Sequence, residues 1–218
     1  MSFSITLVLV VITAITSIGA FSNQRMMDDL IFYPPAITNR GQWYRFFSSG
    51  FIHADYGHLI FNMLSLYLFG RSVEAGFVDL FDAAGRYLYL GMYLSALIVS
   101  LLPTYFRNKE NHYYRGLGAS GAVSAVIFAG LMLSPETEVY LYFIPIPIPG
   151  FIFAPLYLIL SAFMDRRGRD NVNHSAHLWG AIYGLVFVIF ACRFVGYNVI
   201  AMAIERIKWY MKIKGWTH

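Results

Sequence analysis

The chain has 218 residues, of which 58% are hydrophobic and only 13% are charged, with a formal net charge of +4. Average soluble domains carry about 25% charged residues, so this sequence cannot make the polar shell that a water-soluble fold needs. The apolar surplus must therefore face lipid. The small net charge makes nucleic acid a poor partner, and the single cysteine, Cys192, excludes an intramolecular disulfide.

Six mostly uncharged stretches are candidates for membrane-spanning helices. A span needs about 20 mostly apolar residues, because each helical residue adds about 1.5 Å across a hydrocarbon core roughly 30 Å thick. The stretches are residues 1–24, 56–70, 87–106, 116–135, 139–164 and 171–192. They predict an all-α polytopic membrane protein with six transmembrane helices, folded as one domain over residues 1–218.

Three of these stretches need interpretation. The first has no basic residue ahead of its apolar run and no convincing cleavage site, so we interpret it as a helix rather than a signal peptide. The second is short, and we expect it to continue past Gly70 toward Val78 or to begin below the membrane surface. The fifth opens with the run IPIPIPG at residues 144–150, where proline disfavours a helix, so its helix is expected near Phe151.

Two further segments lie outside the spans. Residues 21–57 form a long loop whose apolar and aromatic content argues against disorder and predicts short helices partly embedded in the membrane interface. Residues 198–214 combine Arg206, Lys208, Lys212 and Lys214 with apolar residues. This pattern fits either a short amphipathic basic helix at an anionic membrane surface or a solvated charged tail.

Strongly polar side chains are costly in hydrocarbon, so each one inside a span marks a candidate functional site. They are His58 and Asn62 in the second span, Ser120 in the fourth, and His174 and His177 in the sixth. His58 and Asn62 are four residues apart and therefore share one helix face.

Ser120 and His177 each lie beside glycines. Ser120 is in the run GLGASGAVSA, whose glycines permit close backbone approach and open amides at a helix start, which suit a developing anion. His177 lies one turn before Gly180, which forms a GxxxG with Gly184 that favours close helix packing. Contact between the two helices would bring a serine nucleophile to an imidazole base. The second, fourth and sixth spans run parallel, so His58, Ser120 and His177 are expected at similar depth.

At this point the sequence resembles the rhomboid family of intramembrane serine proteases over most of its length. The family pattern HxxxxHxxxN is present as His53, His58 and Asn62. The pattern GxSG is present as residues 118–121, and AHxxG is present as residues 176–180.

The resemblance implies a rhomboid-like bundle of the bacterial six-helix type, with both termini cytoplasmic and a water-filled cavity opening to the opposite face. It implies that His177 accepts the proton of Ser120 and later protonates the leaving amine. His58, Asn62 and the Ser120 amide then stabilise the oxyanion.

The same resemblance gives supporting roles to the residues that shape the site: His53, Gly118, Gly121, Gly180 and Arg45. It implies no metal and no cofactor. It also implies that no third catalytic carboxylate is used, and the sequence agrees, since the second, fourth and sixth stretches contain no Asp or Glu. Asp165 and Asp170 are expected to be solvated in the loop at residues 165–176, which is either a flexible cap over the site or an ordinary surface loop.

The sequence departs from the family pattern at two places. The family's Trp-Arg motif is only approximated by Trp43, Tyr44 and Arg45. Ser124 stands one turn after the nucleophile, where many relatives carry an aromatic ring that stacks on the catalytic imidazole.

We therefore expect a serine endopeptidase that cleaves transmembrane segments of membrane proteins. The main alternative is a catalytically silent rhomboid-like protein that binds or escorts membrane clients. Zinc and aspartyl intramembrane proteases are disfavoured, because HExxH and paired membrane aspartates are absent.

Expected partners are transmembrane protein substrates and the lipid bilayer. With no presequence or extra helix visible, the expected location is a bacterial inner membrane. The oligomeric state does not follow from the sequence.

Overall fold

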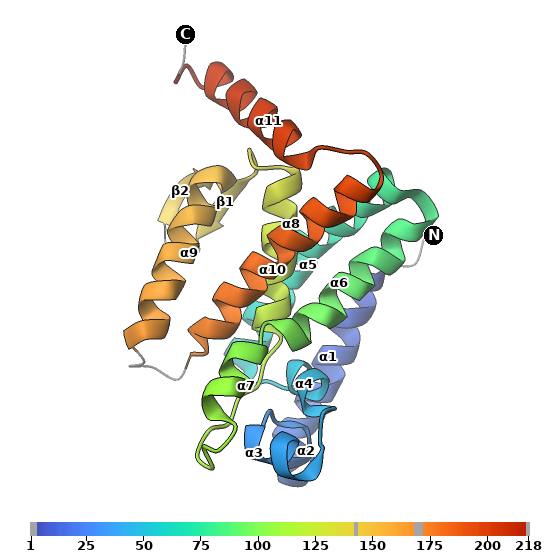
Figure 1. Ribbon diagram of the computed structural model, residues 1–218, viewed down its shortest axis with the longest axis vertical. Coiled ribbons are helices and arrows are strands. Elements are labelled where there is room, and N and C mark those ends of the chain that lie inside the picture. Colours follow the sequence, from blue (N-terminus) through green and yellow to red (C-terminus); the bar gives the residue numbers. More distant parts are fainter. Residues whose placement is uncertain (1–3, 142–143, 168–171, 217–218) are drawn as a thin grey trace.

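The computed structural model describes residues 4–141, 144–167 and 172–216, and these residues are mostly helical. The elements in chain order are α1 (Ile5–Phe21), α2 (Gln24–Leu30), α3 (Pro34–Arg40), α4 (Arg45–Ser48), η1 (Ser49–Phe51), α5 (Tyr56–Phe81), η2 (Asp82–Ala84), α6 (Gly85–Val99), α7 (Leu102–Asn108), α8 (Ser120–Leu133), β1 (Glu138–Leu141), β2 (Ile144–Pro149), α9 (Gly150–Arg167), α10 (His174–Phe194) and α11 (Val199–Ile213). Figure 1 shows the long helices side by side, with α2 to α4 folded at one end and α11 at the other.

Within the described residues, two helical stretches are long and apolar enough to cross a membrane. One covers residues 56–108, from α5 through α7, and the other is α10. The helices α1 and α8 are apolar but shorter, with 17 and 14 residues. Helices α2, α3 and α4 with the turn η1 fold the first loop, which confirms the short helices predicted there.

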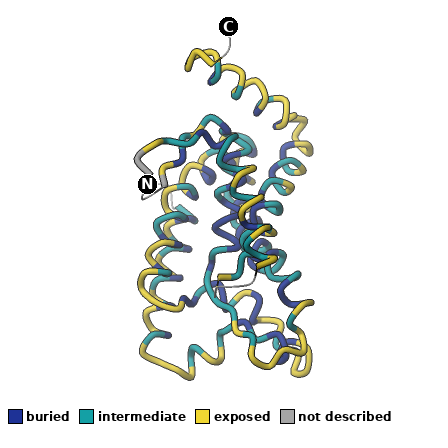
Figure 2. The backbone as a smooth tube through the Cα atoms, turned by 90° about the vertical axis from the view of Figure 1, so that its left-hand side faces the viewer, coloured by how far each residue is buried: buried dark blue, intermediate teal, exposed yellow. Residues whose placement is uncertain are grey.

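Helix α8 is the centre of the bundle. It packs against α5, α6, α9 and α10, and every residue from Gly121 to Val126 is buried. Small side chains at the start of α8 allow its neighbours to approach on all sides. Figure 2 shows that burial is concentrated in the middle of the bundle, whereas α11 is largely exposed. The helix that begins with Ser120 is thus held on several sides.

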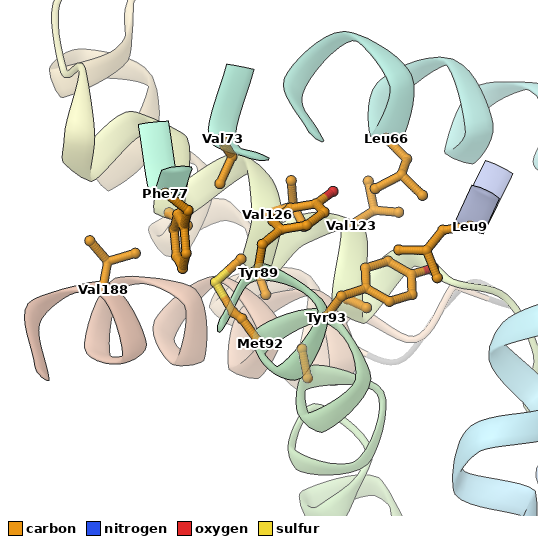
Figure 3. Close-up of a cluster of buried hydrophobic side chains, with 14 of the residues drawn as sticks. Leu9, Leu66, Val73, Phe77, Tyr89, Met92, Tyr93, Val123, Val126 and Val188 are labelled. Atoms are coloured by element: carbon orange, nitrogen blue, oxygen red, sulfur yellow. The ribbon is translucent and has the colours of Figure 1, made fainter. Parts of the chain in front are cut away.

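The apolar core surrounds α8 and extends to the inner faces of α5 and α6. Figure 3 shows Tyr89 and Tyr93 of α6 in one cluster with Leu66 of α5 and Val126 of α8. All four side chains have 0% exposure. The hydroxyl group of Tyr89 is satisfied by Thr6 of α1, whose Oγ1 lies 2.9 Å away. This hydrogen bond joins α1 to the side of the apolar core.

Glu74 is a buried carboxylate inside α5, which runs eleven residues beyond Gly70 and ends at Phe81. Its oxygens accept hydrogen bonds from the Ser4 hydroxyl at 2.8 Å, from the Ile5 amide at 2.8 Å and from the Thr6 amide at 3.0 Å. Amides at a helix start lack partners within the helix and favour negative charge, so Glu74 caps α1.

The helix of the second span continues past Gly70, as expected, and its added part contains Glu74, whereas the stretch at residues 56–70 contains no Asp or Glu. Glu74 lies 16 residues after His58 on α5, or about 24 Å along the helix. That separation rules it out as a third catalytic carboxylate.

Two of the predicted spans are interrupted. In residues 139–164, β1 and β2 pair antiparallel, with Val139 opposite Ile148, and α9 then begins at Gly150, which confirms the helix start predicted near Phe151. Alternating proline holds extended backbone and removes amide donors, which favours this hairpin at an edge. Residues 87–106 divide into α6 and α7 around Ser100, because Pro103 in the first turn of α7 has no amide hydrogen to donate to a carbonyl group of α6.

Asp165 lies within α9 and not in a loop, which corrects the expectation for this residue. Its carboxylate accepts hydrogen bonds from Nη1 of Arg107 at 2.8 and 3.0 Å, and its side chain is only 16% exposed. Of the loop proposed as a cap, residues 168–171 with Asp170 lie outside the described residues, whereas residues 165–167 belong to α9 and residues 174–176 to α10. The Arg107 ion pair ties the end of α9 to α7.

The close packing of α8 on α10 gives a stability prediction. A Cβ atom on Gly184 would collide with the backbone of Ala125, whereas a Cβ atom on Gly91 would meet nothing within 4 Å. We expect Gly184→Ala to lower the free energy of unfolding by about 1–3 kcal/mol through overpacking. Gly91→Ala is the matched control and should raise it by up to about 1 kcal/mol through helix propensity. Unfolding in mixed micelles measures both, and equal effects would contradict the packing.

Candidate active site

Ser120 and His177 lie on either side of the contact between α8 and α10, at the same end of the helix bundle. A Cβ atom on Gly180 would collide with the carbonyl group of Gly121, and a Cβ atom on Gly121 would lie 3.3 Å from the carbonyl oxygen of Ala176. The two backbones therefore touch at the residue that follows Ser120 and at the residue that precedes His177. Ser120 is the first residue of α8 and His177 is the fourth residue of α10, so both lie within one turn of this contact.

His58 lies against the backbone that leads into Ser120. Gly118 has φ of 110°, in the region that favours glycine. A Cβ atom there would lie 2.7 Å from Cε1 and 2.9 Å from Nε2 of His58. Both the backbone conformation and the space thus require glycine at residue 118. The structure brings α5 to the same site as α8 and α10.

The backbone before Ser120 is fixed by hydrogen bonds from the first loop. The Gly118 amide donates to the Ser49 carbonyl oxygen at 2.8 Å, and the Ala119 amide donates to Nε2 of His53 at 3.4 Å. His53 is fully buried. Its role here is to position the approach to Ser120.

Ser17 of α1 determines which nitrogen of His53 carries the proton. The Ser17 hydroxyl donates to the Phe51 carbonyl oxygen at 2.9 Å, so it accepts from Nδ1–H of His53, also at 2.9 Å. Nε2 is then the acceptor that the Ala119 amide needs. Ser17 was not predicted from the sequence, although a serine in an apolar span was an available signal.

His53 is held neutral by its surroundings. Burial and, to a smaller extent, the neighbouring His58 lower the pKa of its imidazole to about 3, while Asp55 opposes the shift. The two rings are 4.9 Å apart between centroids in an edge-to-face arrangement. A neutral His53 is consistent with one ring nitrogen donating and the other accepting.

Asn62 is buried one turn after His58 on α5. Its Nδ2 donates to the carbonyl oxygen of His58 at 3.0 Å. A primary amide carries two N–H donors, and this bond uses one of them. The side chain is thus oriented by its own helix while it retains a second donor for an anion.

The start of α8 offers backbone donors as well. The first hydrogen bond within this helix comes from the Val123 amide to the Ala119 carbonyl oxygen, at 2.9 Å. The amides of residues 120–122 precede it, and Ala119 supplies no side-chain cap. Such a helix start stabilises negative charge on an oxygen close to Ser120.

The start of α10 is anchored beside the site by Asn173. Its Oδ1 accepts from the Ala176 amide at 3.0 Å and from the Thr104 hydroxyl of α7 at 3.1 Å. The rings of His174 and His177 are 6.0 Å apart between centroids, in an edge-to-face arrangement. Among the described residues, no group of three or more His, Cys, Asp or Glu side chains could hold a metal ion.

Comparison with known proteins agrees with this arrangement of motifs. The sequence model of the Rhomboid domain matches residues 40–194, which include both glycine motifs and the His58 to Asn62 pair. The chain belongs to the rhomboid family. Membrane embedding is a property of this family, in agreement with the apolar composition.

Three curated relatives illustrate the similarity. The rhomboid chain is 30% identical over 171 residues to RHOMBOID-like protein 12, mitochondrial, of Arabidopsis thaliana, covering 74% of this chain and 50% of the relative. It is 28% identical to the human Presenilin-associated rhomboid-like protein, mitochondrial, covering 69% and 38%. It is also 28% identical to Rhomboid-like protein 11, chloroplastic, of Arabidopsis thaliana, covering 70% and 54%. The chain thus spans about half the length of the relatives, or less.

The departure at Ser124 has a structural counterpart in this rhomboid. Oγ of Ser124 lies 3.2 Å from the hydroxyl oxygen of Tyr157, on α9. The Tyr157 ring packs on Phe128 of α8, with 5.2 Å between centroids. An aromatic side chain therefore reaches the turn after Ser120 from a different helix. Tyr157 was not found from the sequence, because no pattern in one helix shows what its neighbour supplies.

Arg45 stabilises the first loop and forms its hydrogen bonds there, not with Ser120. It is buried, and Nη1 donates to the carbonyl oxygens of Asp28 at 2.9 Å and Ile31 at 2.7 Å, while Nε donates to Oε1 of Gln42 at 2.7 Å. These bonds hold the first loop together. Because that loop ends in Ser49 and His53, Arg45 supports the site through the loop.

The shifted pKa of His53 gives a pH prediction. Below pH 6.5 the unfolded chain binds a proton at His53 that the folded chain does not bind until about pH 3. The free energy of unfolding should therefore fall as pH drops through this window, by about 1.4 kcal/mol per pH unit. His53→Gln removes this contribution, so its unfolding should depend less steeply on pH. Detergent-induced unfolding followed by circular dichroism measures both slopes, and identical slopes would refute the assignment.

Proposed function

We propose that this rhomboid-family chain is an intramembrane serine endopeptidase in which Ser120 and His177 form the catalytic dyad. The observation that supports it most is the backbone contact of Gly121 with Gly180 and Ala176, because it carries a serine and a histidine from two helices to one end of the bundle. A hydroxyl group becomes a competent nucleophile when an adjacent imidazole can accept its proton.

In the proposed reaction, Nε2 or Nδ1 of His177 accepts the Ser120 proton as Oγ attacks the carbonyl carbon of the scissile peptide. The tetrahedral intermediate then collapses, the C–N bond breaks, and the imidazolium gives its proton to the leaving amine. A water molecule next attacks the acyl-enzyme ester while His177 accepts its proton. Return of that proton to Ser120 releases the new carboxyl terminus.

The oxyanion of both intermediates is proposed to be stabilised by Asn62, His58 and the backbone amide of Ser120. The buried amide of Asn62, with one N–H bonded to the His58 carbonyl oxygen, supports its role as a fixed donor. The position of His58 against Gly118, two residues before Ser120, supports its role. Donors on two different helices would hold the carbonyl group in a defined orientation.

The membrane arrangement proposed here has six spans, formed by α1, α5, α6, α8, α9 and α10, with both termini on the cytoplasmic side. The substrates are proposed to be transmembrane segments of other membrane proteins. The expected bacterial inner membrane finds no support in the relatives, whose names place them in mitochondria or chloroplasts. We therefore propose only that the chain is a multi-pass enzyme of a cellular membrane, without assigning that membrane.

A fluorophosphonate probe tests the nucleophile, since it reacts covalently with activated serines. We expect it to label the wild-type protein in detergent and to leave Ser120→Ala unlabelled. The matched control is Ser134→Ala, at the other end of α8, which should be labelled like the wild type. Equal labelling of Ser120→Ala and wild type would exclude the proposed nucleophile. Unlabelled but folded wild-type protein would instead favour a silent client-binding protein.

Removal of one oxyanion donor should slow chemistry more than binding. We expect Asn62→Ala to lower kcat roughly ten- to a thousandfold with little change in KM, because the donor acts on charge that develops in the transition state. Asn111→Ala, in the exposed loop after α7, serves as the control and should turn over at the wild-type rate. Hydrolysis of a fluorogenic transmembrane peptide measures both, and wild-type kcat in Asn62→Ala would remove it from the mechanism.

A further inference from the structure

A hollow of about 520 Å³ lies between α5, the end of α8 and β1. It is at the far end of α8 from Ser120, and Figure 1 shows the hairpin beside that end. Apolar side chains from all three elements line it, among them Val73, Leu131 and Val139. The proposed peptidase chemistry does not use this hollow.

A second hollow of about 400 Å³ lies along α5 and shares Leu68 and Ser72 with the first. Arg71 lines it. The Arg71 guanidinium donates to the Tyr67 hydroxyl at 3.1 Å and lies 5.5 Å from the centre of that ring. Within the described part of the chain, no carboxylate pairs with Arg71. The two hollows together form a groove, apolar at one end and cationic at the other, which we call the α5 groove.

The position of Arg71 along α5 places it near lipid headgroups. With 26 residues, α5 is about 39 Å long, which exceeds a hydrocarbon core of roughly 30 Å. No Asp, Glu, Lys or Arg occurs from Tyr56 to Gly70, and the charged residues of α5 begin at Arg71. An exposed arginine at this boundary needs an anion, and its planar guanidinium matches phosphate oxygens in a bidentate way.

The one carboxylate that lines the groove is already engaged. Oε1 of Glu138 accepts hydrogen bonds from Nζ of Lys214 at 3.0 Å and from the Tyr210 hydroxyl at 2.9 Å, both from α11. These partners hold the pKa of the Glu138 carboxyl below its usual value, so it is ionised and balanced by Lys214. The charge that remains uncompensated at the groove is that of Arg71.

We propose that the α5 groove binds one anionic phospholipid from the leaflet on the hairpin side. An acyl chain fills the apolar hollow between α5, α8 and β1, and the phosphate group pairs with Arg71. A transmembrane helix of another protein does not fit, because it has several turns and a single turn about 11 Å wide, roughly 500 Å³, would already fill the apolar hollow. The lipid holds the hairpin against α5, since each contributes one wall of the hollow.

Native mass spectrometry of the full chain, titrated with phosphatidylglycerol or phosphatidylcholine in detergent, tests this site. We expect Arg71→Gln to weaken phosphatidylglycerol binding roughly fivefold, the usual worth of one cation near an anionic surface. Arg193→Gln, at the last turn of α10, is the charge control and should bind like the wild type. Ser72→Trp should block the groove, whereas Leu156→Trp, on the exposed face of α9, should not.

Several outcomes would overturn the proposal. One is unchanged phosphatidylglycerol affinity in Arg71→Gln or Ser72→Trp, with each variant shown to be folded by its thermal unfolding midpoint. Another is wild-type protein that binds phosphatidylcholine as tightly as phosphatidylglycerol. A third is slower cleavage of a transmembrane substrate by Ser72→Trp with lipid affinity intact, which would assign the groove to a client. Labelling of Ser120 is independent of every one of these readouts.

Discussion

The contact between α8 and α10 is the constraint on which the rest of the candidate site depends. Side chains normally hold two helix axes 8–10 Å apart, and only the absence of a Cβ atom lets the backbones touch. Here Gly180 meets Gly121, and Gly184 meets Ala125, one turn further along. With two contact points the helices can neither slide nor rotate. The residues beside the first contact, Ser120 and His177, therefore have a defined relation to each other.

The other elements fix the backbone ahead of that contact. Ser49 and His53 in the first loop hold residues 118 and 119, and Ser17 of α1 holds His53 in the required tautomer. Glu74 caps the start of α1 at the opposite end of the bundle, and so keeps Ser17 at its depth. Buried polar groups cost free energy unless they are hydrogen-bonded, so each link of this series favours a single arrangement.

The sequence was sufficient to identify the family, and it singled out the residues of the candidate site because polar groups and paired glycines stand out in apolar spans. Ser17 and Tyr157 were missed, since their importance lies in partners on other helices, His53 and Ser124. Glu74 was missed because charge was assumed to end a span, whereas a helix start can neutralise it. The hairpin was missed because the prolines at residues 144–149 indicated only that the helix starts later, and not that their extended backbone pairs with residues 138–141.

The central claim is that Ser120 and His177 meet across the α8 and α10 contact. A chloroisocoumarin tests it most directly: its ring ester acylates an activated serine, and the electrophilic carbon then exposed alkylates an imidazole within reach. Digestion and tandem mass spectrometry identify the two joined residues. Our account predicts a peptide pair linked between Ser120 and His177. A link from Ser120 to His58 or His174, with none to His177, would contradict it.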